Sequence, residues 1–136
     1  MKIIRQKKGQ ALVEFAVVLP LLFLLVISVF EFGRIYQAKI IVTEAAREGA
    51  RRGIITTNNA EVQAAVWATS APLGTTQTTV PVTIDRSKTV PPTGANTQPS
   101  VIVTATYNVQ LVTPLLKPFF PTNVVTVTGR AQMRTE

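Results

Sequence analysis

Residues 11–30 read ALVEFAVVLPLLFLLVISVF, and this apolar run limits the fold of the chain more than any other feature. A helix of about 20 apolar residues spans the hydrocarbon core of a bilayer, which is about 30 Å thick. The run contains one charged residue, Glu14, and one proline, Pro20, which a membrane helix tolerates with a local bend. The sequence therefore predicts one membrane-spanning helix near the N-terminus, with the lipid bilayer as its partner.

Basic residues flank this run on both sides. The N-terminal flank has no acidic residue and carries Lys2, Arg5, Lys7 and Lys8. By the positive-inside rule this flank stays in the cytoplasm, so residues 31–136 are expected on the extracytoplasmic side. The chain has 14 Lys and Arg against seven Asp and Glu, and their position beside the run indicates contact with anionic lipid headgroups. We expect no nucleic-acid partner.

A cleaved secretory signal is the competing interpretation of the run. Such a signal has an apolar core of about 7–15 residues, followed by small residues at the cleavage site. The run here is longer, and Phe30, Glu31 and Phe32 at its end fit that cleavage site poorly. We therefore expect a single-pass anchor in the cytoplasmic membrane.

Glu14 is the residue of the run that most needs an explanation. An acidic charge at the centre of a membrane helix costs roughly 2.5–3.5 kcal/mol, and less near the end of the span, where Glu14 lies. One interpretation is that Glu14 is interfacial and that the helix begins after it. The other starts from its context, because a basic leader ends in Gly9, Glu14 follows five residues later, and Phe15 comes next.

This context resembles the recognition site of prepilin peptidase in type IV pilins, and most closely the short form found in the Flp/Tad pilus system. The resemblance implies cleavage between Gly9 and Gln10, which makes Glu14 the fifth residue of the mature chain and Phe15 the sixth. It also implies that Glu14 pairs with the new N-terminal amine, commonly that of a neighbouring subunit. An α-amino group with a pKa of about 8 is largely cationic at neutral pH and suits this role.

A helical pattern continues through residues 31–53. Glu44 and Glu48 are placed to pair with arginines three or four residues later, and Gly53 suits a helix C-cap. Small residues four apart would let another helix or a sheet approach closely. These small residues are Ala46, Ala50, Gly49 and Gly53. A solvated helix held by ion pairs is the alternative interpretation.

The stretch GQALVEFA, followed by the apolar helix, FGR and AAREGAR, resembles the TadE-like family over about residues 9–53. Members of this family are minor pilin-like proteins of the Tad (tight adherence) secretion system, with one N-terminal helix and a small outer domain. The resemblance implies processing by prepilin peptidase, other pilin-like subunits as partners, and a role in assembly or export of Flp pili. A major pilin and a type II secretion pseudopilin share the same processing logic.

The remaining sequence predicts a small outer domain. A short helix over 60–71 has Asn58 or Asn59 as its N-cap. Alternating apolar residues predict strands at 80–84, 101–111 and 123–134, and Pro81 indicates that the first is an edge strand. The expected fold class is α+β, with the long N-terminal helix packed on a small antiparallel sheet in a pilin-like arrangement.

These patterns divide the chain into four parts and leave one connection unusual. The parts are a prepilin leader over 1–9, a transmembrane helix over 10–30, a helix extension over 31–53 and an extracytoplasmic α+β domain over 54–136. The connection between the last two strands is proline-rich and contains Leu115, Leu116, Phe119 and Phe120. It either covers the core as a lid or docks on another subunit or the membrane.

Catalysis is not expected. The absence of Cys and His removes thiol nucleophiles, Cys/His zinc sites and His acid–base chemistry, and the isolated glycines form no phosphate loop. We expect no catalytic residue, no metal and no cofactor. The alternative function is that of an unprocessed membrane protein whose outer domain binds a ligand or mediates adhesion. Gly9 and Glu14 together favour a pilin-like subunit, because an uncleaved anchor has no use for that carboxylate.

Overall fold

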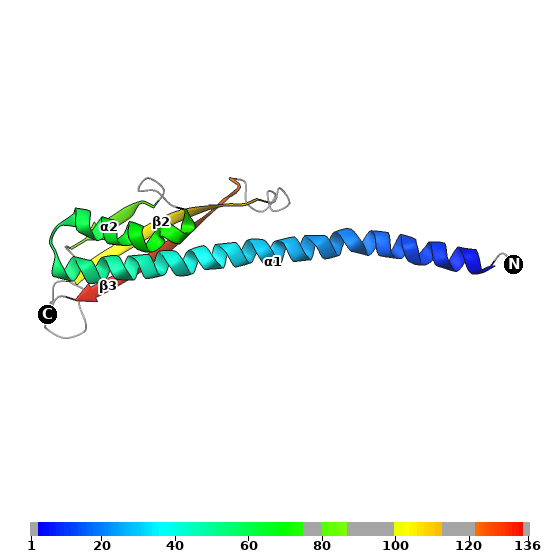
Figure 1. The fold of residues 1–136 in the computed structure, drawn as a ribbon, viewed down its shortest axis with the longest axis horizontal. Coiled ribbons are helices and arrows are strands. Elements are labelled where there is room, and N and C mark those ends of the chain that lie inside the picture. The colour runs from blue at the N-terminus through cyan, green and yellow to red at the C-terminus, as the bar shows by residue number, and fades with distance from the viewer. Residues whose placement is uncertain (1–2, 75–79, 87–99, 113–121, 135–136) are drawn as a thin grey trace. The chain divides into compact units, whose positions relative to one another are not determined.

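The computed structural model describes residues 3–74, 80–86, 100–112 and 122–134. It divides the chain into two compact units, Met1–Arg34 and Ile35–Glu136. Its elements (Figure 1) are α1 (Ile3–Ile55), α2 (Asn59–Ser70), the 3-10 turn η1 (Ala71–Leu73), β1 (Val82–Asp85), β2 (Ser100–Gln110) and β3 (Val124–Arg134).

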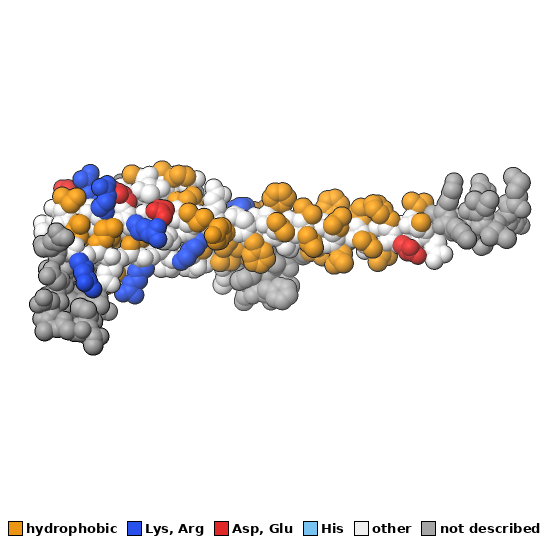
Figure 2. Space-filling view, turned by 90° about the horizontal axis from the view of Figure 1, so that it is seen from below, with side chains coloured by type: hydrophobic (Ala, Val, Ile, Leu, Met, Phe, Trp, Pro, Cys, Tyr) orange, Lys and Arg blue, Asp and Glu red, His pale blue; other side chains and the backbone are white. Residues whose placement is uncertain are grey.

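The first unit is the apolar part of α1. Its large hydrophobic side chains are exposed, with Phe15 at 63% and Phe30 at 72%, and Figure 2 shows such side chains along this helix. A helix keeps its backbone hydrogen bonds internal, which a lipid environment requires. The hydroxyl of Ser28 also donates internally, to the carbonyl of Leu24 at 2.8 Å. Among the described residues, α1 is the one helix long and apolar enough to cross a membrane.

The second unit contains an antiparallel sheet with the order β1-β2-β3. The register pairs Val82 with Ala105 on one side of β2, and Val103 with Ala131 on the other. The N–H of Thr106 donates to the carbonyl of Pro81 at 3.1 Å. β1 lies at one edge of the sheet, where a preceding proline is tolerated.

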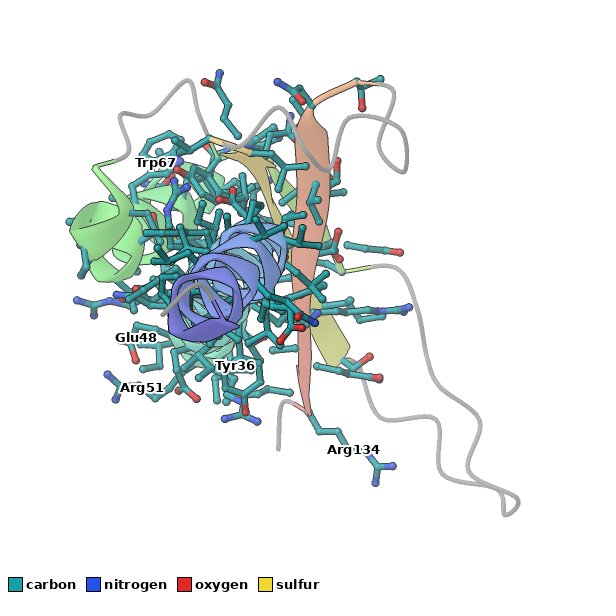
Figure 3. The ribbon with its side chains drawn as sticks, turned by 90° about the vertical axis from the view of Figure 1, so that its right-hand side faces the viewer. Tyr36, Glu48, Arg51, Trp67 and Arg134 are labelled. Atoms are coloured by element: carbon teal, nitrogen blue, oxygen red, sulfur yellow. The ribbon has the colours of Figure 1, made fainter. Side chains whose placement is uncertain are left out.

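The core of the second unit consists almost entirely of alanine and valine. Alternate residues of the strands face the end of α1 and α2, which lie on the same face of the sheet (Figure 3). The fully buried residues with zero exposure include Val42, Ala45, Ala46, Ala50, Val62, Val66, Val80, Val103 and Ala105. Because these side chains are small, the backbones of the helices and strands can approach closely.

Two glycines mark close approaches of β3 and β2 to α1. A Cβ on Gly129 of β3 would lie 2.6 Å from the carbonyl carbon of Val42 and 2.8 Å from the Cα of Thr43. A Cβ on Gly53 of α1 would lie 2.7 Å from a methyl carbon of Val101. Both positions therefore have no space for a side chain.

The position of Gly53 corrects one prediction. α1 continues to Ile55, and among the described glycines a positive φ occurs at Gly74 and not at Gly53. The predicted C-cap at Gly53 is therefore wrong, because the glycine is needed for close contact with β2 and not for a left-handed backbone.

Polar contacts fix the second helix and the short strand. The side chain of Asn58 accepts from the N–H of Ala60 at 3.0 Å and so caps α2 as predicted. The indole N–H of Trp67, near the junction of α2 and the sheet in Figure 3, donates to the carbonyl of Val80 at 3.2 Å.

Arg86 joins three segments immediately after β1. Its guanidinium donates to the carbonyls of Gly53 at 2.7 Å and Thr56 at 3.1 Å, and to the side-chain oxygen of Asn59 at 3.2 Å. The carbonyls of Gly53 and Thr56 lie at the end of α1, where carbonyl groups lack helical partners, and Asn59 lies at the start of α2. Arg86 thereby ties β1 to the turn between the helices.

The predicted fold class is confirmed, because the chain combines a long N-terminal apolar helix with a small three-stranded antiparallel sheet in an α+β arrangement. The predicted strands at 80–84, 101–111 and 123–134 correspond to β1, β2 and β3 within two residues at each end. The predicted helix over 60–71 corresponds to α2.

Candidate functional site

The predicted processing motif lies within the first unit, on α1. Gly9, Gln10, Glu14 and Phe15 are all helical and exposed. A Cβ on Gly9 would meet no atom within 4 Å. Unlike Gly53 and Gly129, Gly9 is therefore not required by any close contact among the described residues.

Glu14 has one polar neighbour on its helix face. On an α-helix the neighbours of a side chain lie three and four residues away. For Glu14 these are Gln10, Ala11, Val17 and Val18. The amide nitrogen Nε2 of Gln10 donates to the Oε1 atom of Glu14 at 3.2 Å, so the carboxylate is partnered within its own helix.

The small residues of α1 lie in the second unit on its buried side. Ala46 and Ala50 have no exposed surface. A Cβ on Gly49 would lie 2.5 Å from a methyl carbon of Val66 in α2 and 3.1 Å from one of Val103 in β2. Together with Gly53, these residues pack against the chain's own second helix and sheet.

The opposite side of α1 carries ion pairs. Arg47 donates to Glu44 at 2.6 Å, and Arg51 donates twice to Glu48, at 2.7 and 2.8 Å. Figure 3 shows Glu48 and Arg51 beside each other on the outside of the helix. The hydrogen bond from Arg51 lowers the pKa of the Glu48 carboxyl below its ordinary value, and the same bond raises the pKa of Arg51. Both features proposed for this stretch thus occur, on different sides of one helix.

Lys39 contacts the free edge of the sheet, which sequence reasoning did not anticipate. The N–H of Leu111 donates to the carbonyl of Asn123 at 2.9 Å, so odd-numbered residues of β3 direct their backbone groups toward β2. Even-numbered residues then direct theirs to the open edge. The ammonium of Lys39 donates to one of these, the carbonyl of Thr128. A lysine at an open edge opposes pairing with another strand.

Several apolar side chains of α1 remain uncovered within the second unit, and two of them are neighbours. Tyr36 is 70% exposed and Ile40 is 48% exposed, and they are neighbours four residues apart on the helix. Their exposure leaves an apolar strip beside the ion-paired side of α1.

Two sequence-based expectations concern the possible docking loop and metal binding. Leu115, Leu116, Phe119 and Phe120 lie outside the described residues, so the lid and docking interpretations of their segment both stay predictions. Within the described ranges, no group of three or more His, Cys, Asp or Glu is placed to hold a metal ion.

Comparison with known proteins gives one result, for the N-terminal part of the chain. The family model described as TadE-like protein matches residues 9–51, which include the processing motif, the apolar run and most of the small-residue face. No curated protein and no solved structure matches the chain significantly. The resemblance inferred from the sequence is thereby confirmed for residues 9–51, the segment in which the chain is similar to the TadE-like family.

Proposed function

We propose that this chain is a minor pilin-like subunit that prepilin peptidase processes after Gly9 and that acts in the assembly of a Tad/Flp-type pilus or secretion apparatus. One observation carries the proposal: Gly9 lies before the exposed apolar run of α1 and Glu14 lies near its start, both within the segment that matches the family. That helix supports membrane anchoring by itself, whereas the proposed processing and assembly depend on the two residues.

The environment of Gly9 supports its role as a cleavage site. Glycine in a helix interior is less favourable than alanine by roughly 0.5–1 kcal/mol, and here no neighbouring atom requires its small size. A peptidase must unwind the helix around the bond that it cleaves, and glycine lowers the free energy needed for this. Gly9 therefore suits recognition better than it suits the stability of α1.

The environment of Glu14 supports a role in assembly. Apart from Gln10, its helical neighbours are apolar, so a bilayer around this turn leaves the carboxylate with few partners. An N-terminal ammonium from a neighbouring subunit would supply a charge-assisted hydrogen bond at this position. Subunits would then associate with a defined offset along their helices.

The proposed topology places the N-terminus in the cytoplasm and the second unit outside the cytoplasmic membrane. Four basic residues before the run retain that end inside, and long segments after a first helix translocate largely regardless of charge. Tyr36 and Ile40 follow the span along the chain and are exposed, and aromatic and apolar side chains there suit the interface or a neighbouring helix.

The topology can be tested with single cysteines, because the natural chain has none. Gln6→Cys and Thr57→Cys are placed on opposite sides of the proposed span, and Thr57 is exposed. Both variants are expressed in cells without prepilin peptidase, because the proposed cleavage would remove residue 6. A membrane-impermeant maleimide added to spheroplasts should label the variant at Thr57 and spare the variant at Gln6 until the membrane is opened. Labelling of the Gln6 variant in closed cells would contradict the proposed orientation.

The assembly role can be tested by Glu14→Ala with Val13→Ala as a matched control on the adjacent helix position. Glu14→Ala is expected to remain in the membrane fraction while pilus production or secretion is lost, and Val13→Ala should behave as the natural chain. Normal pilus output from Glu14→Ala, together with an unprocessed N-terminus, would favour the alternative of a plain membrane protein with a ligand-binding or adhesive outer domain.

A further inference from the structure

The proposed cleavage would make Gln10 the N-terminal residue and expose it to a further reaction, so this inference rests on the proposed function. The bond after Gly9 is followed directly by Gln10, so cleavage places the α-amine and the side-chain carboxamide on the same terminal residue. An N-terminal glutamine can cyclise. Its neutral α-amine attacks Cδ, the new N–Cδ bond forms, the Cδ–Nε2 bond breaks, and ammonia leaves with the displaced proton.

Cyclisation would remove the group on which assembly depends. The product is a lactam, whose nitrogen is an amide and carries no positive charge at neutral pH. A cyclised chain could not present an ammonium to the Glu14 carboxylate of a neighbouring subunit. A chain that needs this ammonium therefore benefits from any contact that slows the ring closure.

The contact between Gln10 and Glu14 has a geometry that would slow the cyclisation. The Nε2 atom of Gln10 donates to Oε1 of Glu14 at 3.2 Å, one turn further along the helix. Ring closure needs Cδ to fold back onto the α-nitrogen of its own residue, in the opposite direction. One side chain cannot satisfy both geometries, so each Gln10 amide bound to Glu14 is withheld from cyclisation.

No competing polar group is available for Glu14 on its helix face. Ala11, Val17 and Val18 are its other neighbours at three and four residues, and none has a polar side chain. In apolar surroundings the hydrogen bond from Gln10 to Glu14 is therefore stronger, and no other side chain of this helix face competes for it.

We propose that Glu14 protects the mature N-terminus by holding the Gln10 carboxamide along the helix, and thereby keeps the α-amine free. Gln10 is a substrate for spontaneous modification, and Glu14 sets its rate. Losing a hydrogen bond to a charged group is worth about a tenfold change in an equilibrium, so losing this contact should accelerate cyclisation about tenfold.

The test follows the mass of the processed chain over time. The full chain is co-expressed with prepilin peptidase, extracted in mild detergent and incubated at pH about 8, where close to half of a free α-amine is neutral. Intact mass spectrometry then distinguishes the open form from the cyclised form, which is lighter by one ammonia. The variants are Glu14→Ala, Glu14→Asp, which keeps the charge on a shorter side chain, and Val13→Ala as the control.

The natural chain and Val13→Ala should cyclise slowly and at the same rate, whereas Glu14→Ala and Glu14→Asp should cyclise about tenfold faster. If Glu14→Ala is not processed, Glu14→Asp carries the comparison because it retains an acidic residue in the motif. Equal rates in the natural chain and the processed Glu14 variants, or no cyclisation in any of them, would overturn this inference alone. Retention of residues 1–9 in the natural chain would overturn the proposed processing and this inference with it.

Discussion

Replacing Gly129 by alanine is expected to destabilise the second unit strongly, because α1 and β3 touch at this residue through their backbones. The added Cβ would lie 2.6 Å from the carbonyl carbon of Val42 and 2.8 Å from the Cα of Thr43. Carbon atoms are in optimal contact at about 3.5–4.0 Å, so the strand or the helix must move by about 1 Å. No side-chain rotation relieves the clash, since the atoms met are backbone atoms.

The expected magnitude follows from this rigidity. Inserting a methyl group into a packed core typically costs about 1–3 kcal/mol, and a backbone clash belongs at the upper end of that range. A loss of about 2–3 kcal/mol in a domain of this size lowers the melting temperature by about 10–20 °C. The fluorescence of Trp67 reports the transition, because it is the single tryptophan of the chain and it bonds to Val80 inside the second unit.

Two other glycines provide matched controls in the full chain in detergent. Gly49→Ala meets methyl carbons of Val66 and Val103, which can shift, so its loss should be smaller. Gly33→Ala meets no atom within 4 Å and should leave the transition unchanged. A melting temperature for Gly129→Ala at or above that of Gly33→Ala would refute the close contact between α1 and β3.

Three further predictions use the same fluorescence transition. Arg86→Lys keeps the positive charge but loses the planar fork that reaches three acceptors, and should cost about 2 kcal/mol, whereas full stability would show that the fork is dispensable. Asn58→Ala removes the cap of α2 and should cost about 1 kcal/mol, while Asn58→Ser should retain most of the stability. Because Arg51 lowers the pKa of Glu48, this pair stabilises the fold above the unfolded pKa of about 4.3 and loses that contribution as the pH falls through the lowered value. Glu48→Gln should therefore lose less stability than the natural chain on acidification below about pH 4.3, and identical acid profiles would contradict the pairing.

The parts of the fold that follow from local patterns could be predicted from the sequence. The alternation of apolar and polar residues in 101–111 and 123–134 specified strands with one buried face, and the structure has β2 and β3 there. The continuous helical pattern through the apolar run likewise predicted α1. These signals are local, since each residue's neighbours along the chain determine its face.

Long-range contacts could not be predicted in the same way. Arg86 and Lys39 bond to backbone carbonyls that are 30 or more residues away, and nothing in their local sequence marks those partners. The close contact of Gly129 has a local signal, because an isolated glycine in a strand indicates a close backbone approach. The predicted role of Gly53 as a C-cap was wrong because its contact with Val101 is long-range, and the local sequence does not reveal it.

The candidate site was predictable because its residues are close in sequence. Gly9, Gln10, Glu14 and Phe15 fall within two helical turns, so a helix alone fixes their spacing. The side-chain contact between Gln10 and Glu14 follows from the same spacing, although the sequence had assigned Gln10 only as the residue after cleavage. A pairing of Glu14 with a second subunit involves a separate molecule, and it stays a prediction.

The central claim is that the chain is a processed pilin-like subunit, and the N-terminus of the mature protein tests it most directly. The natural chain and Gly9→Leu are purified from membranes that contain an active cognate prepilin peptidase, and their intact masses are compared. The account predicts that the natural chain begins at Gln10, with its terminus open or cyclised, and that Gly9→Leu retains residues 1–9. A natural chain that still begins at Met1 beside an active peptidase would contradict it.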